Sequence, residues 1–251
     1  MSRKNLLIAI LALVGLSITS CEDDKKETGT GNVEVSVVLK TDSGFVHIGD
    51  TAYLNNGYKL HLALFRLYLS NVTLLGNGTS NIKEDVILLS PGKLGDNQFT
   101  FSNNLGTFSG LQVGFGLDAT QNDSDPISFD NTHPLASYQG MYWDMLKYRF
   151  AKFEGMAIET STGNQSLVAY HPGRDSIYQT KVFNLPFNLN QANQTKEFEL
   201  HIDLNKIFNG PAGIIDLATE NQTHSNPGSD MEIARKFMIN LAAAATLISK
   251  S

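Results

Sequence analysis

The sequence predicts an all-β fold, a single antiparallel β-sandwich with long loops and one short C-terminal helix. Hydrophobic and polar residues alternate over several short segments, which is the pattern of half-buried strands. Gly, Pro and Asn residues separate these segments, as turns do between the strands of a sandwich. The chain has 251 residues, 41% of them hydrophobic, and no break in composition divides the part after residue 33. We therefore expect one domain over residues 33–251.

The first 21 residues have the pattern of an export signal. Arg3 and Lys4 precede an apolar run that is too short to span a membrane. The run ends in ITSC at residues 18–21, which resembles the lipobox, the site at which bacteria attach lipid to a cysteine. Cys21 is the only cysteine of the chain, and a lone free thiol is unusual in an exported protein. We therefore expect a lipoprotein signal peptide over residues 1–21, with a plain secretory signal as the alternative.

Residues 22–32 contain no hydrophobic side chain and are charged, then rich in Gly and Thr, which is typical of a flexible tether. The expected protein is thus anchored in a membrane of the cell envelope by lipid, facing the periplasm or lying on the outer-membrane surface. A formal net charge of -6, without a Lys or Arg cluster after the leader, argues against nucleic-acid binding. A mature domain without a free cysteine has neither a disulfide nor a thiolate metal site.

The first strand expected in the domain is at residues 33–39, where Val and Leu alternate with polar residues. Residues 59–75 alternate again and end at a Gly-Asn-Gly turn signal. His61 has the opposite parity to the neighbouring leucines, so it is expected to point outward. Further strands are expected at 86–89, 98–101, 110–117, 167–170, 182–189 and 197–204.

Two other segments depart from the strand pattern. Residues 118–139 are polar, and loops of this length in a compact domain are commonly functional. Near the C-terminus, Ser229 and Glu232 have the spacing of a capping box and predict the start of the helix. Residues 242–248 could prolong this helix or return as a last strand, and both alternatives remain open.

An unusually dense run of aromatic residues, GMYWDMLKYRFAKFEG at 140–155, contains the only tryptophan, Trp143. Tyr148 and Phe150 alternate, and Phe153 follows after a one-residue phase change, which indicates a strand with a bulge. Such a segment ordinarily belongs to the core of the sandwich. Because histidines lie in predicted loops on both sides of Trp143, the segment is also a candidate binding site.

Three histidines, His133, His171 and His224, lie in predicted loops near Pro or Gly residues. Imidazole is a borderline-soft ligand, and copper has the highest affinity among the divalent first-row metals, so loop histidines beside an aromatic platform fit a copper site. Six histidines in 251 residues are ordinary usage, so their number alone does not indicate a metal site. His61 and His201 remain alternatives to one of the three named ligands.

The sequence lacks the known signatures of catalysis: a hydrolase elbow, a phosphate loop, a zincin helix, a CxxC pair and a dinucleotide-binding turn. No nucleophile and base have a recognisable spacing. We therefore assign no catalytic residue and expect a protein that is not an enzyme.

Four short motifs resemble those of the MbnP-like family: RLYLSNVTL at 66–74, the run from MYW at 141–143 to FEG at 153–155, HPG at 171–173, and a late histidine ahead of Ile233. The resemblance covers about residues 33–248. Its members are exported bacterial proteins named for a methanobactin-associated, copper-linked protein, and many are lipoproteins of Bacteroidetes-like bacteria.

The resemblance implies a β-rich extracytoplasmic domain that binds copper. In relatives, a tryptophan is oxidised to kynurenine by a di-haem partner of the peroxidase type, and Trp143 corresponds to it. His171 matches the His-x-Gly turn of the family, and His133 and His224 match its loop histidines. The sequence departs from the family in residues 144–147, DMLK, where a second Trp and a Gly are common, and in the cysteines that often follow the His-x-Gly turn. The main alternative is a noncatalytic surface module that binds protein or glycan.

Overall fold

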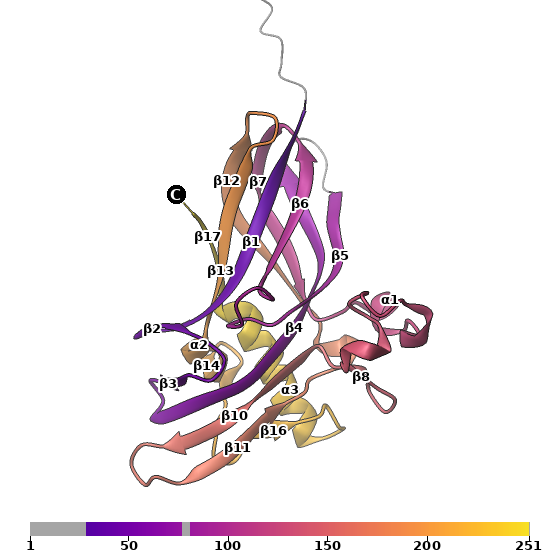
Figure 1. Cartoon of the computed structure of the whole chain (residues 1–251). Helices are drawn as coiled ribbons and strands as arrows, with labels where there is room; N and C mark the ends of the chain where they lie inside the picture. Colours follow the sequence, from indigo (N-terminus) through magenta and orange to yellow (C-terminus); the bar gives the residue numbers. More distant parts are fainter. Residues whose placement is uncertain (1–28, 77–80, 251) are drawn as a thin grey trace, which may run out of the picture.

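The computed structural model describes residues 29–76 and 81–250. Cys21, the expected signal peptide and the tether up to residue 28 lie outside the described residues. The domain is a β-sandwich with few helices, as expected (Figure 1). Within the described part of the chain, no helix is long and apolar enough to cross a membrane.

One sheet has five strands and is built around the strand that begins the domain. Its strands are β17 (Ala245–Ser249), β13 (Thr195–Asp203), β1 (Thr30–Thr41) and β2 (Gly44–Val46), with β6 (Gln98–Asn104) also paired to β1. The strand β1 begins at Thr30, so the last residues of the expected tether are part of the sheet.

The second sheet has eight strands. In order they are β12 (Gln179–Leu189), β7 (Gly106–Phe115), β4 (Tyr58–Gly76), β10 (Ala151–Glu159), β11 (Gln165–Tyr170) and β16 (Gln222–Thr223), with β3 (Thr51–Tyr53) and β5 (Asn81–Leu89) also paired to β4. The long strand β4 lies in the middle of this sheet. Its first half pairs with β10, and its second half pairs with β5 and β7.

The sheets are mixed, whereas we expected a purely antiparallel sandwich. The strand β1 runs parallel to β13, and β11 runs parallel to β16. Both parallel pairs join strands that are distant in the sequence, which alternation within each strand does not predict. The predicted sandwich is therefore confirmed, but the prediction that all of its strand pairs are antiparallel is wrong.

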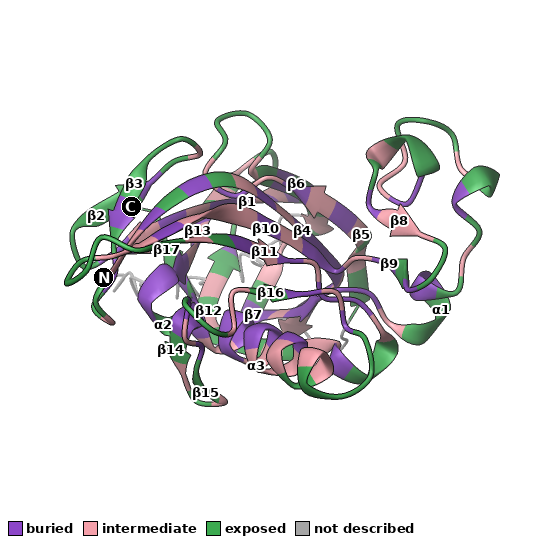
Figure 2. Cartoon of the chain, turned by 90° about the horizontal axis from the view of Figure 1, so that it is seen from below, coloured by how far each residue is buried: buried purple, intermediate pink, exposed green. Residues whose placement is uncertain are grey.

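The C-terminal helix α3 (Ser229–Ala244) contacts β12, β13, β16 and β17. Its buried side faces the strands, and its outer side is partly exposed (Figure 2). The chain leaves the helix at Ala244 and continues as β17, so the two alternatives for residues 242–248 are each correct for a part. The expected capping box is wrong, because the N-cap is Gly228, without a capping side chain.

The aromatic run contributes the core, as its alternation suggested. Tyr148, Phe150 and Phe153 are fully buried. The ring of Phe153 contacts Phe65 with a centroid distance of 5.1 Å, and it also packs against Phe237 of α3. The expected bulge between Phe150 and Phe153 is wrong: the strand is interrupted there, because β9 ends at Tyr148 and β10 begins at Ala151. The pairing of β10 with β4 does shift, but between Glu154 and Gly155, and the extra residue lies on β4.

Candidate metal centre

The long loop before Trp143 projects from the side of the sandwich (Figure 1). It forms α1 (Ala119–Asn122) and the single turns η1 (Pro126–Ser128) and η2 (Ser137–Gln139). Two hydrogen bonds attach it to buried tyrosines: Tyr68 Oη donates to Pro134 O at 2.9 Å, and Tyr148 Oη donates to Leu135 O at 2.8 Å. A loop held in this way can position side chains for binding.

Trp143 follows this loop in a two-residue strand, β8 (Tyr142–Trp143), that pairs with β9 (Lys147–Tyr148). Its indole is half-buried. The guanidinium carbon of Arg149 lies 5.4 Å from the indole centroid, in cation-π contact. The ring centroid of His224 lies 5.8 Å from that of the indole.

His171 and His224 come from separate parts of the chain and meet at this point. The backbone N–H of His171, at the end of β11, donates to Thr223 O at 2.8 Å. The imidazole centroids are 5.1 Å apart, and the ring planes are nearly perpendicular, at 88°. The sheet register therefore places two of the three candidate ligands side by side.

Ser225 holds the two histidine segments together. Its hydroxyl accepts from Gly173 N at 2.9 Å, and its carbonyl accepts from Arg174 Nε at 2.8 Å. Both Arg174 and Ser225 have positive φ, 99° and 57°, which is costly for residues other than Gly. Strained backbone of this kind persists where surrounding contacts fix it, and it is common at binding sites.

His171 is mostly buried and makes one short side-chain contact. Its Nε2 lies 2.7 Å from Glu154 Oε1, and 14% of the His171 side chain is exposed. Burial lowers the pKa of His171 below its ordinary value of 6.5, although the Glu154 carboxylate acts in the opposite direction. The neutral imidazole, the form that binds metal, therefore predominates at neutral pH.

His133 lies apart from this pair. Its ring stacks on Phe129, with centroids 4.1 Å apart, and its Nδ1 accepts from Leu135 N at 3.1 Å. None of its ring contacts or hydrogen bonds involves His171 or His224. The alternatives are also elsewhere: His61 is exposed on β4 beside Thr51, and His201 lies on the other sheet, 2.8 Å from Glu199.

The described residues provide two imidazoles but no larger donor set. Among residues 29–76 and 81–250, no three His, Cys, Asp or Glu side chains lie close enough together to hold a metal ion. Sequence reasoning also missed two neighbours of the site, Glu154 and Arg149. The signal for Glu154 in the sequence was its position, a carboxylate that directly follows the buried Phe153.

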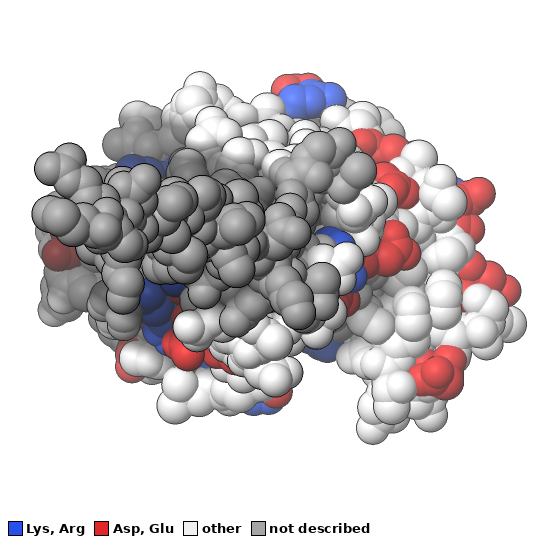
Figure 3. Space-filling model, turned by 90° about the horizontal axis from the view of Figure 1, so that it is seen from above, with Lys and Arg blue, Asp and Glu red and all other residues white. Residues whose placement is uncertain are grey.

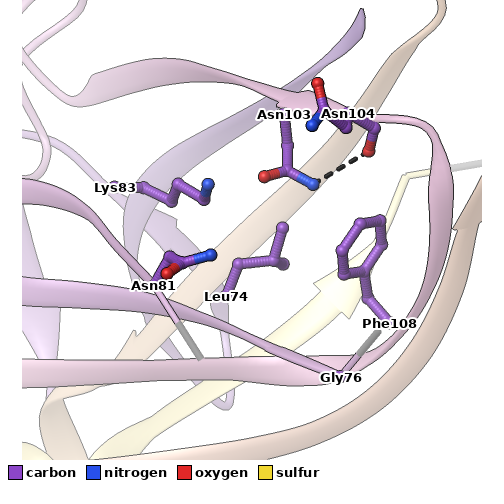
Figure 4. Close-up of a pocket in the computed structure, with 7 residues that line it drawn as sticks. All are labelled: Leu74, Gly76, Asn81, Lys83, Asn103, Asn104 and Phe108. Atoms are coloured by element: carbon purple, nitrogen blue, oxygen red, sulfur yellow. Dashed lines mark hydrogen bonds between the residues drawn. The ribbon is translucent and has the colours of Figure 1, made fainter. Parts of the chain in front are cut away.

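One cavity of the domain adjoins the site and another does not. One of about 210 Å³ adjoins the hairpin that carries Trp143, and its lining includes Met145, Lys147 and Arg174. A smaller one, of about 70 Å³, lies at β4 to β7 (Figure 4). It is lined by Leu74, Gly76, Asn81, Lys83, Asn103, Asn104 and Phe108, none of which is a strong metal ligand.

Seen from above, carboxylates gather along one edge of the molecule (Figure 3).

The sequence matches a family model, MbnP, over residues 30–227. The chain belongs to the MbnP family. The matched region includes Trp143, His171, His224 and Glu154. No curated protein has significant similarity to this chain.

A solved structure, MbnP from Methylosinus trichosporium, is similar to this MbnP-family domain. The identity is 17%, the match covers 88% of this chain and 99% of the other, and the TM-score is 0.50. At this identity the likeness supports the fold. The match to the family model is what confirms the family resemblance expected from the sequence.

Proposed function

We propose that this MbnP-family protein is a copper-binding protein of the cell envelope that holds the metal between His171 and His224. The observation that carries the proposal is the perpendicular contact of the two imidazoles, 5.1 Å between centroids, beside Trp143. Bound copper would supply a Lewis-acidic and redox-active centre. The role is binding, not catalysis.

The two side chains fit a metal ion in spacing and in protonation. Imidazole nitrogens bind metals at about 2.0 Å, so two nitrogens that share an ion lie within about 4 Å of each other. Ring centroids 5.1 Å apart are compatible with that separation. Burial of His171 favours its neutral form, which is the ligand form.

Metal analysis of purified protein and of four variants tests the proposal. We expect one copper per chain, lost in His171→Ala and in His224→Ala. His133→Ala and His201→Ala are the matched controls and should keep the metal, because neither ring contacts the pair. Copper retained in both His171→Ala and His224→Ala would refute the site. If the unaltered protein binds no copper, a surface module for protein or glycan becomes the better interpretation.

The proposal includes oxidative modification of Trp143 by a di-haem partner of the peroxidase type. In support, the indole is half-buried and lies against His224, so a change in the ring would alter the surroundings of a proposed ligand. Conversion to kynurenine adds one oxygen atom and removes one carbon atom. Intact mass and peptide mapping of protein matured in its own envelope should show this change at Trp143, and an unmodified indole would contradict it.

We also propose that lipid attached to Cys21 anchors the protein in a membrane. Lipid chains on a cysteine would bind the domain to a membrane of the envelope. The variant Cys21→Ser should move the protein from the membrane fraction to the soluble fraction. If the variant stays in the membrane fraction, the lipid anchor is refuted.

A further inference from the structure

The side chain of Glu154 makes the closest contact to the candidate metal centre. Its Oε1 lies 2.7 Å from Nε2 of His171, and no other hydrogen bond of the His171 ring is seen among the described residues. A carboxylate accepts and does not donate, so the proton of the neutral imidazole belongs on Nε2. The lone pair is then on Nδ1.

The backbone fixes the position of Glu154. The strand β10 pairs Glu154 with Leu64 but pairs Gly155 with Leu62, so Ala63 is the extra residue of a bulge on β4. Bulges redirect side chains and are frequent next to active sites. A Cβ on Gly155 would lie 2.4 Å from His61 O, so this register requires glycine.

On the other side, Glu154 is opposite Ala169 of β11, and His171 follows two residues later on the same face. The carboxylate also lies 3.8 Å from Lys152 Nζ. Its orientation is therefore set by the sheet register and by a neighbouring cation.

We infer that Glu154 is a positioning residue that holds the proton of His171 on Nε2 and leaves Nδ1 as the nitrogen that binds metal. This inference rests on the proposed copper site. Metal-ligating histidines commonly donate their other N–H to a carboxylate, which fixes the tautomer and the ring orientation. Glu154 is thus part of the site without being a ligand.

The chain contains a matched control. His201 and Glu199 form the same kind of pair, with 2.8 Å between Nε2 and Oε2, on the other sheet and away from Trp143. Glu199→Ala removes an equivalent carboxylate without touching the candidate centre. Glu154→Gln is the conservative variant, because the amide oxygen still accepts a hydrogen bond.

The test is nitrogen-15 NMR of the histidine side chains in the protein, first without metal and then with Cu(I), which is diamagnetic. Without metal, we expect a downfield, exchange-protected Nε2–H signal for His171. The signal should be lost in Glu154→Ala, retained in Glu154→Gln and unaffected by Glu199→Ala. On addition of Cu(I), the Nδ1 resonance should shift while Nε2 keeps its proton. Copper affinity should fall about 10- to 100-fold in Glu154→Ala and should not change in Glu199→Ala.

Different failures have different meanings. If Nε2 loses its proton when Cu(I) binds, Nε2 is the ligand atom and the inference is overturned, while the copper site stands. If the metal-free protein shows no Glu154-dependent Nε2–H signal, the inference is also overturned. If that signal is present but Cu(I) shifts neither nitrogen of His171 nor of His224, the proposed function fails, and the assignment of Nδ1 as a ligand fails with it.

Discussion

The carboxylate of Asp230, at the start of α3, accepts the backbone N–H of His224, with distances of 3.1 and 3.2 Å to its two oxygens. One of these oxygens also accepts from Asn226 N at 2.6 Å. The helix start therefore holds the loop that carries His224. An acidic residue in the first turn also interacts favourably with the helix dipole.

Asp230→Ala should weaken both the fold and the copper site. Loss of the loop hydrogen bonds should lower the free energy of unfolding by about 1–3 kcal/mol, because two N–H groups lose a charged acceptor. Copper affinity should fall as His224 becomes mobile. Denaturant unfolding and copper titration measure the two effects. Glu232→Ala, which removes a carboxylate of the same turn paired with Arg235, is the control and should leave copper affinity unchanged.

Gly155→Ala should disturb the bulge that positions Glu154. The new Cβ would lie 2.4 Å from the backbone oxygen of His61, so β10 or β4 must move. Overpacking of this kind costs about 1–3 kcal/mol of unfolding free energy. The Nε2–H signal of His171 should weaken in parallel. In Gly163→Ala, the Cβ has open space and only the positive φ of 77° is unfavourable, so stability can fall but the His171 signal should persist.

Lys181→Met should destabilise the C-terminal end of α3. The ammonium donates to Ala242 O and Ala243 O at 3.0 Å and to Ala245 O at 2.6 Å. A cation at this position satisfies carbonyls that the helix leaves unpaired. We expect thermal or denaturant unfolding to show a loss of about 1–3 kcal/mol. Lys93→Met, which removes an exposed ion pair with Asp96, should have little effect, and equal losses would contradict this interpretation.

Copper affinity should fall as the pH is lowered. Protons compete with metal for an imidazole only below its pKa, and burial lowers the pKa of His171, so competition at this residue begins below its ordinary value of 6.5. With two histidine ligands, the affinity should decrease by up to about a hundredfold per pH unit well below both pKa values, whereas a carboxylate-only site would keep its affinity to about pH 4. A competition titration from pH 7 to pH 5 checks this. Equal affinity at both ends would exclude His171 and His224 as ligands.

The sequence by itself determined most of the strands and the core. Alternation at 33–39 and 59–75 predicted β1 and β4, because a strand with one buried face requires every second residue to be apolar. The aromatic run was correctly assigned to the core, but its phase change marks a break between β9 and β10 and not a bulge. The bulge on β4 does have a sequence signal, because the alternating leucines of this segment change parity between Leu64 and Leu67.

Only the tertiary structure decided which of the candidate residues meet. His171 and His224 are adjacent because β11 runs parallel to β16, a pairing that depends on register between distant segments and not on local periodicity. His133 has the same local signature as His224, yet it stacks on Phe129. The capping box failed because the helix begins one residue earlier than its spacing requires, with Gly228 in place of Ser229 as the N-cap. Local patterns report which residues are buried, whereas long-range strand pairing determines which side chains share a site.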